Sequence, residues 1–449
     1  ALMAETVIVK SSELDRALGP VMLWGLGVGY VISGEYFGWN LGLPVGGTLG
    51  LLVAALIVSV MAITFVFSYA ELACAMPRAG GVFVYASRGL GPAWGFLGGA
   101  AQIVEFVFAP PAIAAAIGAY FVTYFPGTDA KVFAVAAYVL FTALNIWGVR
   151  QSAIFELVIT ILAVVELLIF AGVTAPHFQY ANLTRDALPN GWGGVFAALP
   201  FAIWFYLAIE GVANVAEEAK NPQKDIVRGF GSAIITLVVL ALLTLVCAVG
   251  VDGWQAVVFR PGETTPLDTP LPLAFGKVVG EGHALFHMLV TVGLFGLVAS
   301  FNGIVLVAGR AIMEFGRVGY APRWVGHTLK NRKTPAPALA INLVVGIAAL
   351  MTGKTGEIIT LSVFGAMTLY AISMVTHIAL RRKEPELKRP FMTPWYPWLP
   401  ITALALSLLC LGSMVWYYPA IAAVYVAILA AGCGWYIFSV PKERKKAHI

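Results

Sequence analysis

The chain has 449 residues, of which 60% are hydrophobic and 11% are charged, and its formal net charge is +5. Its mean hydropathy of +0.86 lies far outside the range of soluble domains, which excludes a soluble enzyme or binding module. The positive charge predicts no nucleic-acid partner, because membrane topology accounts for it, as the distribution of the basic residues indicates.

Apolar segments of roughly 20 residues recur along the chain, and a hydrocarbon core about 30 Å thick requires this length. They predict an all-α integral membrane protein embedded in a lipid bilayer. The twelve predicted spans are residues 18–41, 48–74, 92–123, 132–149, 152–173, 193–214, 229–251, 284–312, 336–352, 356–380, 397–416 and 419–439.

Basic residues are distributed unevenly when the connections are assigned alternately to two sides. One side has 23 of the 28 Lys and Arg residues, and the other has only Lys131, Arg185, Arg260, Lys277 and Lys354. Because basic loops stay inside, this asymmetry predicts that both termini are cytoplasmic. The predicted location is the inner (cytoplasmic) membrane, as a multi-pass protein.

The first span has a carboxylate at its middle, in the run VISGEYFGW over residues 31–39. A charged side chain at mid-bilayer costs about 2.5–3.5 kcal/mol and usually faces a water-filled path or a bound ion. Glycines crowd the same stretch, and backbone leaves a helix at that depth only where it is buried in protein or lines a cavity. The run therefore predicts a broken helix at a binding site, with Ser33, Gly34 and Glu35 at the break.

The sixth span has the same peculiarity in the run FAIWFYLAIEG over residues 201–211, where small residues accompany Glu210. Two interrupted helices five spans apart are what an inverted repeat of five helices leaves in a sequence. We expect a substrate site between the two breaks.

Further acids in the spans are candidates for function. Glu105 lies in the third span close to Pro110 and Pro111, which disturb a helix and can open a pocket. Glu166 in the fifth span is a candidate for ion coupling, and Glu71 at the end of the second span is expected to pair with a base. A structural role, as a hydrogen-bonding partner within or between helices, stays the alternative for the acids at the predicted site.

Sequence patterns of catalysis are missing from the chain. It has neither a Gly-x-Ser-x-Gly motif nor a His-rich cluster, and its four cysteines lie singly in or beside apolar segments. We therefore expect no enzymatic activity, no metal and no cofactor. A channel is not favoured either, because no short filter sequence is repeated.

Four groups of residues in the connections occur together in one order. They are PRAGGVFVY at 77–85 with GPAWGF at 91–96, EEAKNP at 217–222, GR at 309–310 through GYAP at 319–322, and RPF at 389–391 with PWYP at 394–397. With these motifs, nearly the whole chain resembles the amino acid–polyamine–organocation (APC) superfamily of permeases.

This resemblance implies a leucine-transporter-like fold of 12 transmembrane helices, with a 5+5 inverted repeat and discontinuous helices 1 and 6. The organisation that it implies is a cytoplasmic segment 1–17, a transport core 18–380 with repeats at about 18–173 and 193–380, a cytoplasmic loop 381–396, two accessory helices in 397–439 and a basic cytoplasmic tail 440–449.

Within the superfamily, VISGEYFGWN at 31–40 and QIVEFVFAPP at 102–111 most resemble the bacterial ethanolamine permeases. Members that carry amino acids usually have Gly-Ser-Gly and an aliphatic residue at the first break, where free amides hold the substrate carboxylate. Here Ile32 replaces the first glycine and Glu35 replaces the aliphatic residue. A fixed anion at this place repels a carboxylate and attracts an ammonium group.

The resemblance thus implies a secondary active transporter that imports ethanolamine or a closely related small cationic amine by alternating access. A cationic amino-acid or polyamine permease or exchanger of the same fold is the alternative. The coupling ion is expected to be H+ or Na+. In some relatives a lysine of the fifth span replaces a sodium ion, but this chain has Ala163 at the corresponding position. The expected substrate-binding residues are Ser33, Gly34, Glu35, Glu105, Trp204, Tyr206 and Ala208, and those expected for gating or proton coupling are Glu210 and Glu166.

Overall fold

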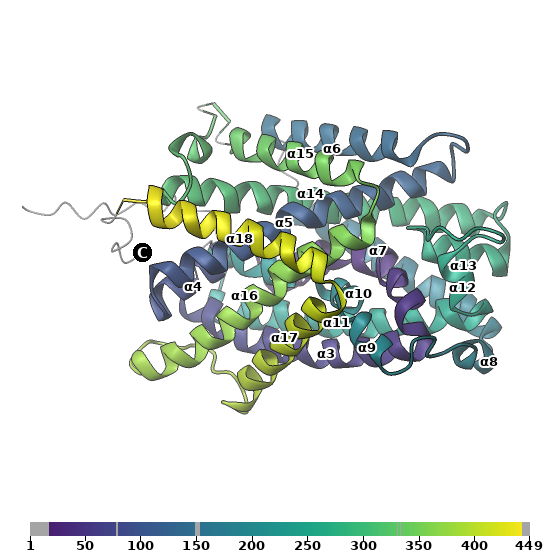
Figure 1. The fold of residues 1–449 in the computed structure, drawn as a ribbon, viewed down its shortest axis with the longest axis horizontal. Helices are drawn as coiled ribbons and strands as arrows, with labels where there is room; N and C mark the ends of the chain where they lie inside the picture. Colours follow the sequence, from purple (N-terminus) through teal and green to yellow (C-terminus); the bar gives the residue numbers. More distant parts are fainter. Residues whose placement is uncertain (1–17, 78–79, 149–152, 330, 333, 442–449) are drawn as a thin grey trace, which may run out of the picture.

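Membrane-spanning helices make up the protein. The computed structural model describes residues 18–77, 80–148, 153–329, 331–332 and 334–441, and helices run along its long axis (Figure 1). Ten apolar segments of the described residues are long enough to cross a membrane. One is Trp39–Ala75, which includes α3 (Leu43–Ala75), and another is Leu199–Ala216. The other eight are the long helices α5 (Pro92–Val122), α6 (Ala130–Trp147), α7 (Ala153–Thr174), α11 (Pro222–Asp252), α14 (Ala284–Val318), α16 (Thr355–Lys383), α17 (Trp398–Tyr417) and α18 (Pro419–Ser439).

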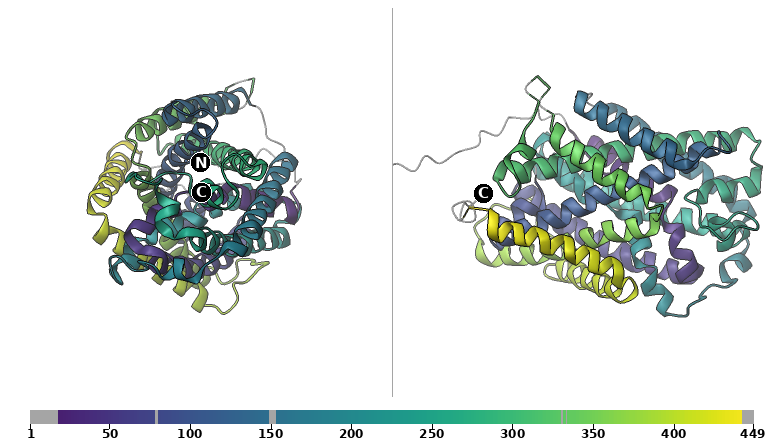
Figure 2. Two further views of the ribbon diagram at one scale, coloured as in Figure 1. Left: turned by 90° about the vertical axis from the view of Figure 1, so that its right-hand side faces the viewer. Right: turned by 45° about the horizontal axis from the view of Figure 1, so that its top comes forward.

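Two shorter apolar helices complete the twelve predicted spans. They are α1 (Pro20–Val31) in the interrupted first span and α15 (Ala336–Met351) in the ninth. The predicted all-helical fold with its two discontinuous helices is therefore confirmed. The helices α17 and α18 lie at the periphery of the bundle, and α18 is the least buried of the long helices (Figure 2).

The two ends of the bundle differ in their connections. We call one the α4 end, after the short helix α4 (Val82–Gly89), and the last long helix, α18, also finishes there (Figure 1). We call the other the α13 end, which has the short helices α8 (Tyr180–Thr184), α12 (Trp254–Val258) and α13 (Pro270–Val279) (Figure 1). The segment 1–17, most of the tail 440–449 and Arg78 of the first family motif lie outside the described residues.

The first span breaks just after Glu35. The helix α1 is followed by the single turn α2 (Ser33–Tyr36), after which Phe37 is extended and Gly38 has a φ of 89°. The 3-10 turn η1 (Trp39–Gly42) then leads into α3, in which Gly47 is non-helical with a φ of 66°. This kink separates residues 39–46 from the second span, which matches the predicted start of that span at residue 48.

The sixth span is divided into four short helical pieces. It consists of α9 (Gly193–Ala197), α10 (Leu199–Ile203), the 3-10 turn η3 (Trp204–Tyr206) and the 3-10 helix η4 (Ile209–Glu218). Between η3 and η4, Leu207 is extended and Ala208 is left-handed, with a φ of 72°. A left-handed alanine is unfavourable by roughly 1–2 kcal/mol, so the surrounding packing must hold it.

Close contacts between small residues bring the long helices together, as is usual in membranes. A Cβ placed on Gly365 of α16 would lie 2.5 Å from the carbonyl oxygen of Ala101 on α5, and one on Gly229 of α11 would lie 2.5 Å from the Cβ of Leu23 on α1. These glycines allow α5 and α16, and α1 and α11, to pack backbone to backbone around the site.

A buried ion cluster joins three segments at the α4 end. The carboxylate of Glu71 accepts two hydrogen bonds of 2.7 Å from Arg381, lies 3.2 Å from Arg389 Nε and 3.0 Å from His377 Nε2, and accepts a 2.7 Å bond from the amide of Thr393. The predicted pairing of Glu71 with a base is confirmed. The cluster connects α3, α16 and the segment before α17.

Candidate functional site

The breaks of the first and sixth spans touch directly. A Cβ on Gly34 would overlap the carbonyl oxygen of Trp204, and one on Gly38 would overlap the Trp204 indole nitrogen. Phe37 meets Trp204 edge to face with 5.5 Å between ring centroids, and Trp39 stacks on Phe205 at 5.9 Å. The glycines therefore position the two non-helical segments against each other.

Glu35 lies inside the bundle at this contact. Its side chain is 0% exposed, and neither carboxylate oxygen has a hydrogen-bond partner among the described residues. Tyr36 and Tyr206 lie close enough to interact with it electrostatically. An ionised carboxylate is very costly to bury without compensation, so this geometry suits a cationic ligand.

Two aromatic residues of η3 border the same region. Trp204 is buried, and its Nε1 has no hydrogen-bond partner among the described residues. The hydroxyl group of Tyr206 lies 2.7 Å from the Ser59 hydroxyl on α3. The indole thus presents both an aromatic face and an unused N–H donor, whereas the phenol is engaged with α3.

Ser33 ties the first break to α14. Its hydroxyl lies 2.8 Å from that of Ser300, which donates a 2.6 Å hydrogen bond to the carbonyl oxygen of Tyr30. Because this chain of bonds uses the Ser33 hydroxyl, the side chain positions the break in the present conformation.

Glu105 lies at the sixth break, near Glu210. One Glu105 oxygen accepts a 3.1 Å hydrogen bond from the amide of Ala208, and Glu105 and Glu210 lie close enough to interact electrostatically. Glu210 also accepts a 3.1 Å bond from Tyr370 on α16. The structure therefore brings three predicted site residues together in one group, next to η4.

Glu166 on α7 has a separate partner. The hydroxyl of Tyr36 donates to the Glu166 carboxylate and lies 3.2 Å from the carbonyl oxygen of Ala163, while Tyr120 donates to the carbonyl oxygen of Tyr36 at 3.3 Å. Sequence reasoning missed Tyr36 and Tyr370 as partners of the acids. Tyr36 directly follows Glu35, which is a usable signal, but nothing in the sequence around Tyr370 indicates its contact with Glu210.

Main-chain contacts close the α4 end below the site. The amide of Leu18 donates to the carbonyl oxygen of Glu218 at 2.9 Å, and the amide of Lys220 donates to that of Leu18 at 2.8 Å. These bonds join the start of the first span to the end of η4. Together with the burial of Glu35, Trp204 and Glu210, they describe a site closed toward this end.

A loop closes the α13 end. The side-chain amide of Asn40 donates to the carbonyl oxygen of Leu267 at 2.8 Å, and the Thr355 hydroxyl donates to Asp268 at 3.0 Å. Partial burial raises the pKa of Asp268 to about 6, while the hydrogen bond from Thr355 opposes this shift. The connection 251–282 therefore contacts both η1 and α16.

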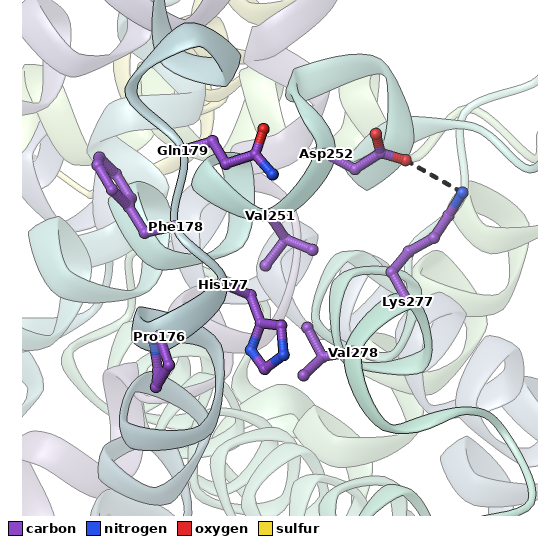
Figure 3. A pocket seen from close by; sticks show the side chains of 8 residues that line it. All are labelled: Pro176, His177, Phe178, Gln179, Val251, Asp252, Lys277 and Val278. Atoms are coloured by element: carbon purple, nitrogen blue, oxygen red, sulfur yellow. Dashed lines mark ion pairs between the residues drawn. The ribbon is translucent and has the colours of Figure 1, made fainter.

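Two cavities open at the α13 end away from the breaks. The larger one, of about 380 Å³, has Asp252 and Lys277 at its rim, 3.2 Å apart, and His177 between α7 and α13 (Figure 3). The other, of about 310 Å³, lies beside Arg260 and Glu281. Neither is lined by residues of the two breaks. Among the described residues, no group of three or more His, Cys, Asp and Glu side chains could hold a metal ion.

A bundle of membrane-spanning helices with a closed polar site between two helix breaks defines a membrane transporter. The family described as "Amino acid permease" matches residues 18–438, so the chain belongs to this family. An uncharacterized transporter of Rhizobium meliloti is 29% identical over 89% of this chain and 86% of its own length.

Several relatives have names that state a substrate, and two of them differ in the charge of that substrate. The branched-chain amino acid permease BcaP of Bacillus subtilis is 24% identical, over 92% of this chain and 91% of its own. The vacuolar cationic amino acid transporter 4 of Arabidopsis thaliana is 26% identical, over 83% of this chain and 64% of its own. The family is therefore one of transporters for amino-acid-like solutes, with members that differ in substrate charge.

Proposed function

We propose that the chain is a secondary active transporter that imports ethanolamine, or a closely related small cationic amine, by alternating access. The observation that carries this proposal is the Glu35 carboxylate, fully buried where the two breaks meet and without a hydrogen-bond partner among the described residues. A buried anion needs a cation or a proton to compensate it, and a substrate ammonium group supplies the cation.

The same carboxylate argues against a zwitterionic substrate. A substrate carboxylate at the amides of the first break would lie next to Glu35, and like charges in a buried site are strongly unfavourable. An amino alcohol keeps the ammonium group and has no acid, so it fits the charge of the site.

The other residues of the site have complementary roles in this proposal. The face of Trp204 adds a cation–π interaction of about 0.5–2 kcal/mol to the ammonium, and its unpartnered indole N–H donates to the substrate hydroxyl. Ser33, Gly34 and Ala208 shape the breaks, and Tyr206 borders Glu35.

Orientation supports import of a cation. In the proposed topology the α4 end, with most of the basic residues, faces the cytoplasm, and residues 18–380 form the transport core. An inside-negative potential of 100 mV then favours entry of each positive charge by about 2.3 kcal/mol.

Uptake into proteoliposomes tests the proposal. We expect saturable uptake of labelled ethanolamine that excess unlabelled ethanolamine abolishes and that leucine leaves unchanged. Uptake of leucine without uptake of ethanolamine would contradict the proposed substrate.

The variant Glu35→Gln tests the residue itself. It removes the charge with almost no change in size, and we expect the apparent affinity for ethanolamine to fall at least about tenfold, which corresponds to about 1.4 kcal/mol. The matched control is Glu357→Gln, an exposed acid at the α13 end that pairs with Lys354 at 3.0 Å. Equal uptake by both variants and the wild type would remove Glu35 from substrate binding.

A cationic amino-acid or polyamine permease is the second candidate. The similarity to the cationic amino acid transporter of Arabidopsis thaliana favours it, and Glu35 would attract those substrates too. Competition experiments with arginine, putrescine and choline separate the candidates, because only the proposed ethanolamine transporter is expected to discriminate against arginine and putrescine by size.

A further inference from the structure

A buried acid on α7 lies between the first break and the α4 end. Glu156 is in the first turn of α7, the helix that leads into α8 at the α13 end, and it is 3% exposed. A Cβ on Gly29 of α1 would lie 2.6 Å from Glu156 Oε1 and 2.8 Å from the Thr160 hydroxyl. Gly29 precedes Glu35 by six residues, which is about 9 Å along a helix. Glu156 therefore faces α1 on the α4 side of Glu35.

The Glu156 carboxylate is not compensated. Its Oε1 has no hydrogen-bond partner, and no Lys, Arg or His forms an ion pair with it among the described residues. The neighbouring Thr160 hydroxyl donates its one hydrogen to the carbonyl oxygen of Gly25 at 3.1 Å. Because buried polar groups are normally satisfied, an acid that only joined two helices would have a donor here. The position suits a cation that is present for part of the transport cycle.

The ring of Tyr30 fills the space beside this acid. A Cβ on Gly303 of α14 would lie 2.8 Å from the ring, and a Cβ on Gly211 of η4 would lie 3.1 Å from it. Tyr30 is 8% exposed, and Glu156 lies close enough to interact with its hydroxyl electrostatically. In the closed conformation, α1, η4 and α14 therefore leave no open path next to Glu156.

We propose that Glu156 is a release site: a second binding site for the ammonium group of the transported amine, occupied after the amine leaves Glu35 and before it reaches the cytoplasm. The inference rests on the proposed transport of a cationic amine. It adds to that function a second site and the route by which the amine leaves.

The position of Glu156 explains when the release site is available. Opening of the α4 end breaks the main-chain bonds that hold Leu18, at the start of α1, to the end of η4. Because Glu156 lies against α1, movement of this helix uncovers the carboxylate. A cation that leaves Glu35 would otherwise be inside the bilayer without a counter-charge, which is very unfavourable. The second carboxylate therefore lowers the barrier to release.

Transport and binding measured separately test the release site. Glu156→Gln removes the charge with almost no change in size, and we expect the Vmax of ethanolamine uptake into proteoliposomes to fall at least about fivefold. The Kd of ethanolamine, from isothermal titration calorimetry of purified protein, is expected to stay within about twofold of the wild type. Glu156→Asp keeps the charge and is expected to keep most of the rate. An unchanged Vmax in Glu156→Gln, or an equal loss in affinity and rate, would overturn the inference.

A structural role of Glu156 gives a different result. It predicts a lower unfolding temperature of Glu156→Gln and equal losses of rate in the Asp and Gln variants, and this outcome would also overturn the inference. The matched control is Glu314→Gln, a partly exposed acid of α14 at the α4 end that pairs with Arg317 at 3.1 Å. It removes the same charge and is expected to keep the wild-type rate. A fall equal to that of Glu156→Gln would assign the effect to surface charge.

Chemical labelling tests the release site without a substrate. Thr160→Cys places a thiol next to Glu156, and the unaltered protein gives the background from its native cysteines. From the α4 side, we compare the rates of the cationic trimethylammonium-ethyl and the anionic sulfonatoethyl methanethiosulfonate. We expect the cation-to-anion ratio of these rates to fall at least about threefold when Glu156→Gln is added.

The labelling result separates the two proposals. An unchanged ratio, or no labelling of Thr160→Cys from the α4 side, would overturn the release site. The expected fall in the ratio, together with absent ethanolamine uptake by the wild type, would reject the proposed substrate and leave the cation site standing.

Discussion

Gly34 determines how closely the two broken helices approach. Any side chain at this position would meet the backbone of Trp204 and Phe205, which is the least adjustable part of the neighbouring span. The sequence indicates a break at this glycine from its composition, but the direct contact with the sixth span requires the three-dimensional structure.

We expect Gly34→Ala to destabilise the protein by about 1–3 kcal/mol, the usual cost of overpacking, and to abolish uptake. The matched control is Gly172→Ala in α7, where a Cβ would meet nothing within 4 Å. There, replacement of a helical glycine should stabilise the protein by about 0.5–1 kcal/mol. Thermal unfolding in detergent measures both variants, and similar shifts would contradict the packing described for the breaks.

At the scale of single residues, the sequence indicates candidate residues of the site by their chemistry but does not indicate their contacts. Glu35 stands out because an acid in an apolar segment is expensive and visible without a structure. The approach of Glu105 to Glu210 was not predictable, since more than a hundred residues separate them and no local pattern records which helix faces meet. For the same reason, Tyr370 could not be found from the sequence.

Among the helices and their connections, the cluster around Glu71 holds the α4 end together. One carboxylate there connects α3 with α16 and with the segment before α17, and the guanidinium of Arg381 also lies 4.4 Å above the ring of Tyr396. Buried ion pairs of this kind lose much stability when only one partner is removed, because the remaining charge is uncompensated.

We therefore expect Glu71→Gln to destabilise the protein by about 3–5 kcal/mol, since two arginines would remain against a neutral side chain. The control is Glu384→Gln at the same end. Glu384 pairs with Arg88 at 2.6 Å, but the two side chains are 33% and 41% exposed, so the change should cost less than about 1 kcal/mol. If thermal unfolding midpoints of the two variants coincided, the cluster would have no special role.

The positions of the membrane-spanning helices agree closely with the spans predicted from hydropathy, because a bilayer fixes the length of a span. The predicted second span begins at residue 48, and Gly47 is where the backbone leaves the helix. What hydropathy does not indicate is the internal division of a span. The small residues beside Glu210 predicted a break in the sixth span, but its position at left-handed Ala208 depends on the bond from the Ala208 amide to Glu105, which is a tertiary interaction.

For the molecule as a whole, closure at the α13 end depends on a titratable group. Asp268 has a pKa of about 6 in the folded protein, above its ordinary value of 3.8, because the loop partly buries it against Thr355. A raised pKa means that the protonated carboxyl stabilises the folded loop. This contribution is fully present below about pH 4 and is lost as the pH rises through about 6.

We expect the amides of the loop over residues 259–269 to exchange with deuterium more slowly below pH 6 than above it, after correction for intrinsic exchange rates. Asp268→Asn, which stays neutral, should remove this difference while it keeps an oxygen that can accept the bond from Thr355. The connection 123–129 at the same end serves as an internal reference. A pH-dependent protection that persists in the variant would assign the effect to another group.

The closure at the opposite end has a different character, because it consists of backbone amides and carbonyls at Leu18, Glu218 and Lys220. Peptide groups are the same in every residue except proline, which lacks the N–H. A substitution other than proline at these three positions therefore keeps the backbone groups that form this closure. Relatives that transport other substrates can keep the same main-chain closure while their selectivity changes at the residues that contact the substrate.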